Sequence, residues 1–357
     1  MNPVYGREEI DSVCEYMNMS GWVMEHSLTR KMEQMICEYT GARYAHMVPS
    51  ATSGLLIASI VANITNGTKF AVPAYTQAAT ANGAISLGGV PSIVDVDMDS
   101  FVIDFDLIPS DCEVVFVTSI NGRYSDSTLD NIKKLRHRGI FVIEDSAQSL
   151  GSWSNNCHIG TNGDMGVFSF GAPKIITTGQ GGCIVTDNRE ISDKIKAIKN
   201  FGRTVGTGET YNTFGLNFKF TDLQAAFGIE QMKKLPMIVE RKRSIFKEYM
   251  AFLSDVGEFI TTDLDKTTPT YPEILINDRK NLIEYLARHD VGTREVYSSL
   301  AIQPFHRKWA TSPTPNTDYI SSRGLQLPSQ YNLDTRDILT ISNYIREFFG
   351  MDRLRVM

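Results

Sequence analysis

The chain has 357 residues, of which 42% are hydrophobic and 21% charged, and its formal net charge is −6. This composition is ordinary for a globular protein, and the length favours a large domain followed by a smaller one. The net negative charge argues against a nucleic-acid partner. The one basic run, 240–247, falls in a helical pattern, and we interpret it as a solvated face.

The cysteines and histidines show no spacing typical of a metal site, and the cysteines no pattern of a disulfide framework. Scattered cysteines fit a reducing compartment. The N-terminal segment lacks an apolar stretch of the secretory type, and no long apolar run follows. We therefore expect a cytoplasmic protein without a membrane span or a metal.

Helical patterns come first, over 8–17, 28–39 and 54–62. Short β-rich runs then alternate with helical segments, and this alternation predicts βαβ units in a mainly parallel sheet with helices on both faces. The β-rich runs cover 69–74, 91–97, 113–119, 139–145, 165–170 and 182–187.

The second half begins with a helix over 222–232, which we expect Pro236 to break before another helix runs to about 253. A surface loop is predicted over 313–316, and further helices over 281–289 and 335–349. The result is an α/β protein with a large domain over 1–235 and a smaller α+β domain over 236–357.

Three polar features lie where ligands bind in such a fold, beyond the carboxyl ends of parallel strands. Asp145 ends the strand of "IFVIEDSAQSLGS", and Gln148 follows one turn later. Hydroxyl residues of "MVPSATSG" open a helix, whose free N–H groups bind phosphate well. Lys174 stands among small and hydroxyl residues in "FSFGAPKIITTGQGG". Taken singly, each has a structural interpretation, as a helix cap or a surface lysine.

Taken together, the three features are the parts that a pyridoxal phosphate (PLP) site requires. A lysine forms the Schiff base, a carboxylate keeps the pyridine nitrogen protonated, and a helix start holds the 5′-phosphate. We therefore expect Lys174, Asp145 and the segment after Val48 to meet at one site.

The chain resembles the DegT-like nucleotide-sugar aminotransferases of PLP fold type I nearly from end to end. The resemblance rests on the segments just quoted and on "VPAYTQAATANGAI", "GLNFKFTDLQAAFGIEQMKKL", "VGTREVYSSLAIQP" and "LQLPS", which stand in the order of that family. It implies that Lys174 carries PLP as an internal aldimine and moves the proton during catalysis. Asp145 then pairs with the ring nitrogen, and Gln148 lies near the ring hydroxyl.

The resemblance also implies the remaining contacts. The phosphate contacts are Thr52, Ser53, Ser169 and, from the partner subunit of a homodimer with shared active sites, Asn217. Gln77 stands at the face of the ring. Arg294 helps to hold the nucleotide-sugar, unless it is an ordinary surface arginine. Trp22 and Met24 either line the sugar pocket or pack a junction between helices.

The reaction implied is a ping-pong transfer of an amino group from L-glutamate, through pyridoxamine phosphate (PMP), to a nucleotide-linked sugar. "KIITTGQGG" and "NFKFTDLQAA" resemble the branch that aminates carbon 4 of a 4-keto-6-deoxy sugar, giving perosamine- or viosamine-type products. Three alternatives stay open: amination at carbon 3, a PLP-dependent sugar dehydratase, and a non-catalytic relative that binds sugar nucleotides.

Several positions depart from the family pattern. Gln77 stands at the place of a ring that usually stacks on PLP, and we consider Tyr75 as a substitute for it. The other departures are Ser119 and Ala301 at two histidine positions, Gln180 at a glutamate and Lys219 at an arginine. Because the lysine and the aspartate are both present, these changes favour a shifted substrate over a loss of catalysis.

Overall fold

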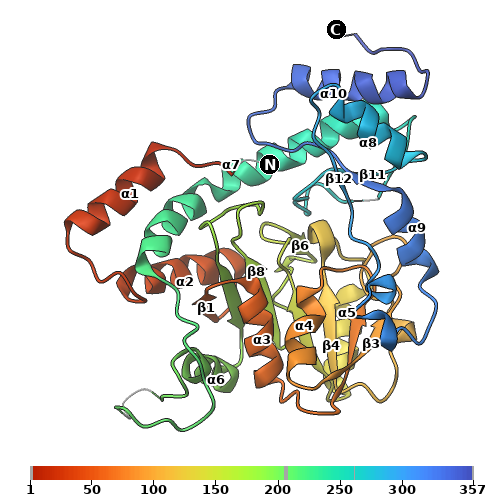
Figure 1. Ribbon diagram of the computed structural model, residues 1–357. Coiled ribbons are helices and arrows are strands. Elements are labelled where there is room, and N and C mark those ends of the chain that lie inside the picture. The colour runs from red at the N-terminus through yellow and green to blue at the C-terminus, as the bar shows by residue number, and fades with distance from the viewer. Residues whose placement is uncertain (1–2, 205–207, 261, 356–357) are drawn as a thin grey trace.

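The computed structural model describes residues 3–204, 208–260 and 262–355. In these ranges the chain forms a seven-stranded sheet with helices on both faces, and a C-terminal part built on a four-stranded sheet (Figure 1). The order of the large sheet is β1-β9-β8-β5-β4-β2-β3. Strands β8, β5, β4, β2 and β3 pair in parallel, whereas β9 pairs antiparallel with both β8 and β1. The predicted mainly parallel sheet and α/β class are confirmed.

The strands of the large sheet are mostly apolar because both faces are covered. In β4, for example, Val115 and Val117 face one hydrophobic cluster, and Val114 and Phe116 face another. The seven strands are β1 (Tyr44–Val48), β2 (Lys69–Pro73), β3 (Val90–Val94), β4 (Val114–Thr118), β5 (Phe141–Asp145), β8 (Met165–Ser169) and β9 (Gly182–Thr186).

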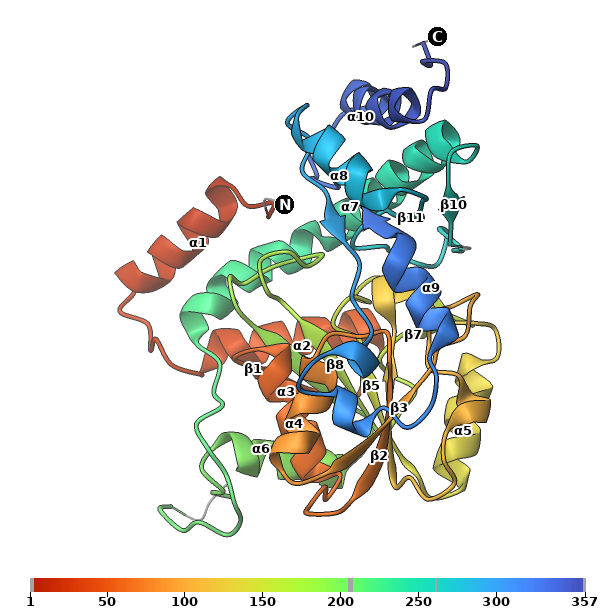
Figure 2. The ribbon, with the colours of Figure 1, turned by 45° about the vertical axis from the view of Figure 1, so that its right-hand side comes forward.

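Helices on the two faces bury these clusters. One face packs against α3 (Ala51–Val61), α4 (Ala79–Ser86) and α6 (Arg189–Lys199). The other packs against α2 (Ser27–Thr40), α5 (Thr128–His137) and the first half of α7 (Asp222–Leu253). Helix α1 (Arg7–Asn18) lies beside α7 in both views (Figures 1 and 2).

The C-terminal part has its own core. Its antiparallel sheet has the order β10-β11-β13-β12, and the second half of α7 packs with this sheet and with α8 and α10. The elements of this part are β10 (Glu258–Phe259), β11 (Glu273–Leu275), α8 (Arg279–Ala287), β12 (Arg294–Glu295), α9 (Pro315–Arg323), β13 (Gly324–Gln326) and α10 (Thr335–Phe348).

Short elements complete the chain. The strands β6 (Trp153–Ser154) and β7 (Cys157–His158) form a two-stranded sheet, and single 3-10 turns form η1 (Phe105–Leu107), η2 (Ile120–Gly122), η3 (Leu300–Ile302) and η4 (Arg307–Trp309).

Helix α7 runs unbroken through Pro236, so the predicted break there is wrong. The proline lacks only one backbone donor, and it lies on the exposed side of the helix. Its neighbours Leu235 and Ile238 are buried, and their packing offsets the cost of about 3 kcal/mol for an interior proline. Residues up to Val239 belong to the core of the large sheet, and residues from Ile245 belong to that of the small sheet. The domain division at 235/236 stays a prediction.

The basic run on α7 is largely not a solvated face, contrary to expectation. Lys242 is only 6% exposed, and its Nζ donates to the Ser329 carbonyl at 2.7 Å. Arg243 Nε donates to the Thr267 carbonyl at 3.1 Å. These cations hold loop carbonyls at the junction of the two parts.

The predicted loop over 313–316 is wrong in its second half, because α9 begins at Pro315. Proline is favoured at the first turn of a helix. The N–H groups of Asn316 and Thr317 donate to the two carboxylate oxygens of Asp95, both at 2.9 Å. Asp95 thus accepts hydrogen bonds from N–H groups at the start of α9, although it is more than 200 residues away in the sequence. The sequence around Pro315 does not indicate this contact.

Within the described ranges, no helix combines the length and the apolar character needed to cross a membrane. All five cysteines are free thiols. The same ranges hold no group of three or more His, Cys, Asp or Glu side chains that could bind a metal ion.

Candidate active site

A cavity of about 250 Å³ lies at the carboxyl ends of β4, β5 and β8. This is the edge at which ligands bind in parallel sheets. Most of the predicted site residues line it together, namely Thr52, Gln77, Asp145, Gln148, Ser169, Lys174 and Arg294.

Lys174 lies in the loop after β8 and is partly buried. Its backbone N–H donates to the Gly171 carbonyl at 3.1 Å. Burial away from water, opposed by the charge of Asp145 and assisted by that of Arg294, lowers the pKa of the Lys174 ammonium to about 8. The side chain is thus much closer to its neutral, nucleophilic form than a surface lysine is.

Asp145 ends β5 and is 5% exposed. Its Oδ2 accepts a hydrogen bond from Thr80 Oγ1 at 2.6 Å, and its Oδ1 accepts one from the Ala147 N–H at 3.2 Å. The pKa of this carboxyl is raised, because the effect of burial outweighs the hydrogen bonds from Thr80 and Ala147 and the charge of Lys174, which lower it. Asp145 is not a helix cap, because the residues after it form turns.

The start of α3 faces the same cavity through Ala51 and Thr52. Ser50 caps the helix: its Oγ accepts from the Ser53 N–H at 3.1 Å, and its carbonyl accepts from the Gly54 N–H at 3.0 Å. The N–H groups of Ala51 and Thr52 precede these bonds and lie at the positive end of the helix. An anion such as phosphate suits this position.

Ser53 does not line the cavity. Its Oγ accepts from the Ser50 N–H at 3.0 Å, which completes the capping box, and its hydroxyl donates to the Ser50 carbonyl at 2.8 Å. Its phosphate contact stays a prediction. Ser169, at the end of β8, does line the cavity, and its Oγ accepts from the Gly171 N–H at 3.4 Å.

Gln77 reaches the cavity from the turn before α4, where its Oε1 accepts from the Ala79 N–H at 2.5 Å. Tyr75 does not take the place of a stacking ring. It is completely buried in another cluster, edge-on to Phe101 and Tyr297, and does not line the cavity. The interpretation of Tyr75 as a substitute is therefore wrong.

Gln148 is held from two sides: its Oε1 accepts from the Asn121 N–H at 3.1 Å, and its Nε2 donates to the Tyr297 hydroxyl at 2.9 Å. Tyr297 is a wall of the cavity that sequence reasoning missed, although it stands only three residues after Arg294. The threonines around Asp145 were missed as well. The sequence sign of these residues, Thr76 and Thr80, is the spacing of the two threonines in "YTQAAT", which is easily interpreted as a helix cap.

Besides Ser53, three predicted residues lie outside the cavity of this chain. Trp22 is 63% and Met24 40% exposed, and Asn217 is exposed as well. Met24 forms a bridge with Thr221, so these segments lie side by side on the surface. The single chain does not bring these residues to the cavity.

Of the departures from the family pattern, Gln77 and Ser119 line the cavity. Ser119 directly follows the end of β4. Its hydroxyl hydrogen-bonds the Ser149 hydroxyl, at 2.5 Å. Lys219 lies over the ring of Phe201, with Nζ 5.9 Å from the ring centroid. Gln180 and Ala301 also lie away from the lining of this cavity.

Residues 4–346 match the DegT/DnrJ/EryC1/StrS aminotransferase family. A relative from Methanocaldococcus jannaschii, the uncharacterized protein MJ1066, is 30% identical over 98% of this chain and 97% of its own length. Among solved structures, the aminotransferase TlmJ from Streptoalloteichus hindustanus superposes with a TM-score of 0.91, at 23% identity and 98% coverage of both chains. The E. coli GDP-4-keto-6-deoxy-D-mannose-3-dehydratase, solved with bound hydrated PLP, gives 0.87 at 21% identity, covering 97% of this chain and 99% of that one.

The residues of the cavity fit PLP. A lysine with a lowered pKa, a buried carboxylate and an open helix start surround one space. Strand β9 packs closely against the start of α3. A Cβ on Gly182 of β9 would stand 2.5 Å from the Ala51 nitrogen, so only glycine allows this approach. The chain belongs to the DegT/DnrJ/EryC1/StrS aminotransferase family, whose aminotransferases are PLP-dependent enzymes.

Proposed function

We propose that the protein transfers an amino group from L-glutamate to a nucleotide-linked 4-keto-6-deoxy sugar. The observation that carries the proposal is that Lys174, Asp145 and the start of α3 line one cavity. PLP, when bound there, supplies an electron sink for the bond changes at the amino-bearing carbon.

The chain's own residues have distinct roles in this proposal. Lys174 would hold the cofactor covalently, and its neutral amine would move a proton to and from the reacting carbon. Asp145 holds a proton on the ring nitrogen, and the N–H groups of Ala51 and Thr52 hold the phosphate. Gln148 orients the ring hydroxyl.

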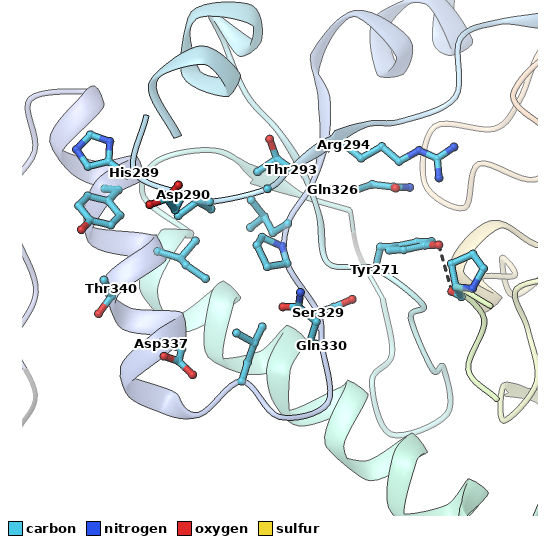
Figure 3. A pocket seen from close by; sticks show the side chains of 18 residues that line it. Tyr271, His289, Asp290, Thr293, Arg294, Gln326, Ser329, Gln330, Asp337 and Thr340 are labelled. Carbon is cyan, nitrogen blue, oxygen red and sulfur yellow. Dashed lines mark hydrogen bonds between the residues drawn. The ribbon is translucent and has the colours of Figure 1, made fainter. Parts of the chain in front are cut away.

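The substrate needs more space than the cofactor cavity offers. That cavity is about 250 Å³, below the roughly 300 Å³ at which pockets for drug-sized ligands begin. Two larger cavities, of about 620 and 520 Å³, adjoin it and share Arg294 with it. In the first of these, Arg294 extends toward the side of Tyr271 and away from His289 and Asp290 (Figure 3). A cation at this junction suits the diphosphate of a sugar nucleotide.

A homodimer with shared active sites is the second part of the proposal. In the segment between α6 and α7, residues 200–204 and 208–216 stand away from the body of the chain (Figures 1 and 2) and expose large apolar side chains. Trp22 and Met24 are exposed beside the end of this segment. Apolar surface of this kind favours a protein partner, and a second copy would bring Asn217 to the neighbouring cavity. The exposed apolar residues of the segment are Phe201, Tyr211, Phe214 and Leu216.

Amination at carbon 4 rests on the motifs "KIITTGQGG" and "NFKFTDLQAA". A sugar dehydratase is the second candidate, because one such enzyme shares the fold. Lys174 favours the aminotransferase, since dehydratases that resemble this family carry a histidine at that position. The five free thiols support a reducing, cytoplasmic setting.

The test traces the transferred nitrogen atom from the amino donor to the sugar. The purified protein with PLP is given L-glutamate labelled with nitrogen-15 and a 4-keto-6-deoxy sugar nucleotide. We expect the label in the sugar, coupled to the proton on carbon 4 in a nitrogen–proton correlation spectrum. A label on carbon 3, or a product that has lost oxygen without gaining nitrogen, would contradict the proposal.

A further inference from the structure

The carboxylate of Asp145 accepts hydrogen bonds from one hydroxyl, that of Thr80, and from the N–H of Ala147. Asp145 is 5% exposed, and no ion pair of this carboxylate occurs within the described ranges. Its closest contact is the Thr80 hydroxyl, at 2.6 Å from Oδ2. Thr80 itself is completely buried, so water does not compete for this bond.

A second hydroxyl stands behind the first. Thr76 Oγ1 lies 2.7 Å from Thr80 Oγ1, and Thr76 is 2% exposed. An ionised carboxylate only accepts hydrogen bonds, so the single proton of Thr80 points at Asp145. The Thr80 oxygen is then free to accept the proton of Thr76. The two hydroxyl dipoles are aligned toward the carboxylate, and aligned hydrogen bonds strengthen one another.

The framework fixes this chain of hydroxyls. Thr80 is in the first turn of α4, whose positive end favours a nearby negative charge. Thr118, the last residue of β4, is paired in register with Asp145 on β5, and its Oγ1 lies 3.4 Å from that of Thr76. This chain of hydroxyls thus runs from Thr118 on β4 through Thr76 to Thr80, whose hydroxyl contacts the carboxylate. The other titratable or charged side chains that line the cavity are Lys174, Arg294 and Tyr297.

Burial alone favours the neutral form of a carboxyl group. A neutral Asp145 would not hold a proton on the ring nitrogen of PLP, and the electron sink would weaken. We propose that Thr80, supported by Thr76, is a positioning residue that keeps Asp145 ionised and oriented toward the ring nitrogen. The inference rests on the proposed PLP chemistry of this cavity, and it adds residues to the site that act through Asp145 rather than on the substrate.

The test compares Thr80→Val, which removes the hydroxyl at constant shape, with Thr80→Ser, which retains it. The first measurement uses PLP labelled with nitrogen-15 at the ring and reads the ring nitrogen by NMR. We expect a protonated nitrogen in the wild type and in Thr80→Ser. In Thr80→Val the resonance moves toward the position found in Asp145→Asn, in which no carboxylate is present. The half-reaction with glutamate slows by about tenfold in Thr80→Val, as the loss of a hydrogen bond to a charged group implies.

The second measurement needs no cofactor. In the apo-protein, a carbon-13 titration of the Asp145 carboxyl shows a higher pKa in Thr80→Val than in the wild type or Thr80→Ser. Thr40→Val is the matched control, because Thr40 is also buried and its hydroxyl donates to the Ile36 carbonyl at 2.8 Å, in α2. It leaves both the ring nitrogen and the Asp145 titration unchanged.

The outcomes are separable. A folded Thr80→Val protein with a wild-type ring-nitrogen resonance and an unchanged Asp145 titration would overturn the role of Thr80, with the proposed function intact. Failure of the wild type to bind labelled PLP would overturn the proposed function, and the titration of the apo-protein would still decide whether Thr80 holds Asp145 ionised.

Discussion

The side-chain amide of Gln148 donates a hydrogen bond of 2.9 Å to the hydroxyl of Tyr297. Gln148 follows β5 of the large sheet, and Tyr297 follows β12 of the small one, so this bond joins the two parts of the chain at the wall of the cavity. Burial raises the pKa of the Tyr297 phenol to about 12, which keeps it protonated at neutral pH. The second part of the chain therefore completes the cavity and orients the Gln148 amide, which we propose lies near the cofactor ring.

Removing this hydroxyl should weaken cofactor binding. In Tyr297→Phe the amide of Gln148 loses its acceptor and its fixed orientation, and we expect the Kd for PLP to rise roughly fivefold, as for one neutral hydrogen bond. Equilibrium dialysis measures this. Tyr285→Phe, on α8 and stacked against His289, serves as the control and keeps the wild-type Kd. Equal values for Tyr297→Phe and the wild type would show that the bond does not orient Gln148.

Reaction of the apo-protein with PLP should follow the titration of Lys174. The neutral amine is the nucleophile, so the rate of covalent binding rises with pH and levels off above about 8, where burial has placed the pKa of this lysine. The rate is read from the growth of the absorbance of lysine-bound PLP. A midpoint near the ordinary lysine pKa of 10.5 would contradict the buried setting of Lys174.

Arg294 provides a second test of the same titration. Its positive charge disfavours the charged form of Lys174. In Arg294→Gln the pKa of Lys174 therefore rises, and the midpoint of the rate profile moves to higher pH. Arg288→Gln, an exposed arginine just after α8, removes the same charge elsewhere and leaves the midpoint in place. A midpoint unmoved in Arg294→Gln would place the guanidinium too far from the lysine to matter.

A buried ion pair fastens the two parts of the chain together. Arg123 and Glu273 are 3% and 0% exposed, and Arg123 Nη2 lies 2.8 Å from Glu273 Oε2. Arg123→Met leaves the glutamate charge buried without its partner, and we expect a loss of about 3–5 kcal/mol in the free energy of unfolding, measured with urea. Arg136→Met breaks a partly exposed pair with Asp164 and should cost less than about 1 kcal/mol. Similar losses in both variants would refute the special role of the buried pair.

Shared active sites predict that two inactive variants restore each other. Lys174→Ala lacks the proposed catalytic lysine, and Asn217→Asp places a negative charge where the partner's phosphate is expected. A hybrid dimer holds one cavity with both native residues, so mixing the two variants after partial unfolding should restore activity. If each cavity is complete within one chain, the mixture stays as inactive as its components.

The sequence predicted most of the large sheet because its strands are short, apolar and separated by clear helical patterns. It also placed Lys174 and Asp145 in one site, since both stand beside ends of parallel strands. The break at Pro236 was wrong because packing on both sides of the proline holds α7 together, and packing is not visible in local sequence.

Other features depend on contacts between distant segments. Asp95 accepts a hydrogen bond from an N–H group at the start of α9, and Lys242 of α7 binds the carbonyl of Ser329 in a separate loop. Tyr297 and Gln148, which form a hydrogen bond, are 149 positions apart in the chain. From the sequence alone, Thr80 is interpreted as a helix-start residue. Its hydrogen bond to Asp145 is evident only when the packing of α4 against β5 is known. No local pattern encodes these pairings, because each is set by how the elements pack.

The most direct test of the central claim is the absorbance spectrum of the purified protein with PLP, before and after L-glutamate is added. We predict a band of lysine-bound PLP that glutamate converts to the spectrum of PMP, and that is missing both in Lys174→Ala and in Lys174→Arg, which retains the charge but forms no Schiff base. Lys194→Ala, on the exposed side of α6, keeps the band. A wild-type protein that forms no such band, or a Lys174 variant that retains both the band and its response to glutamate, would contradict the account.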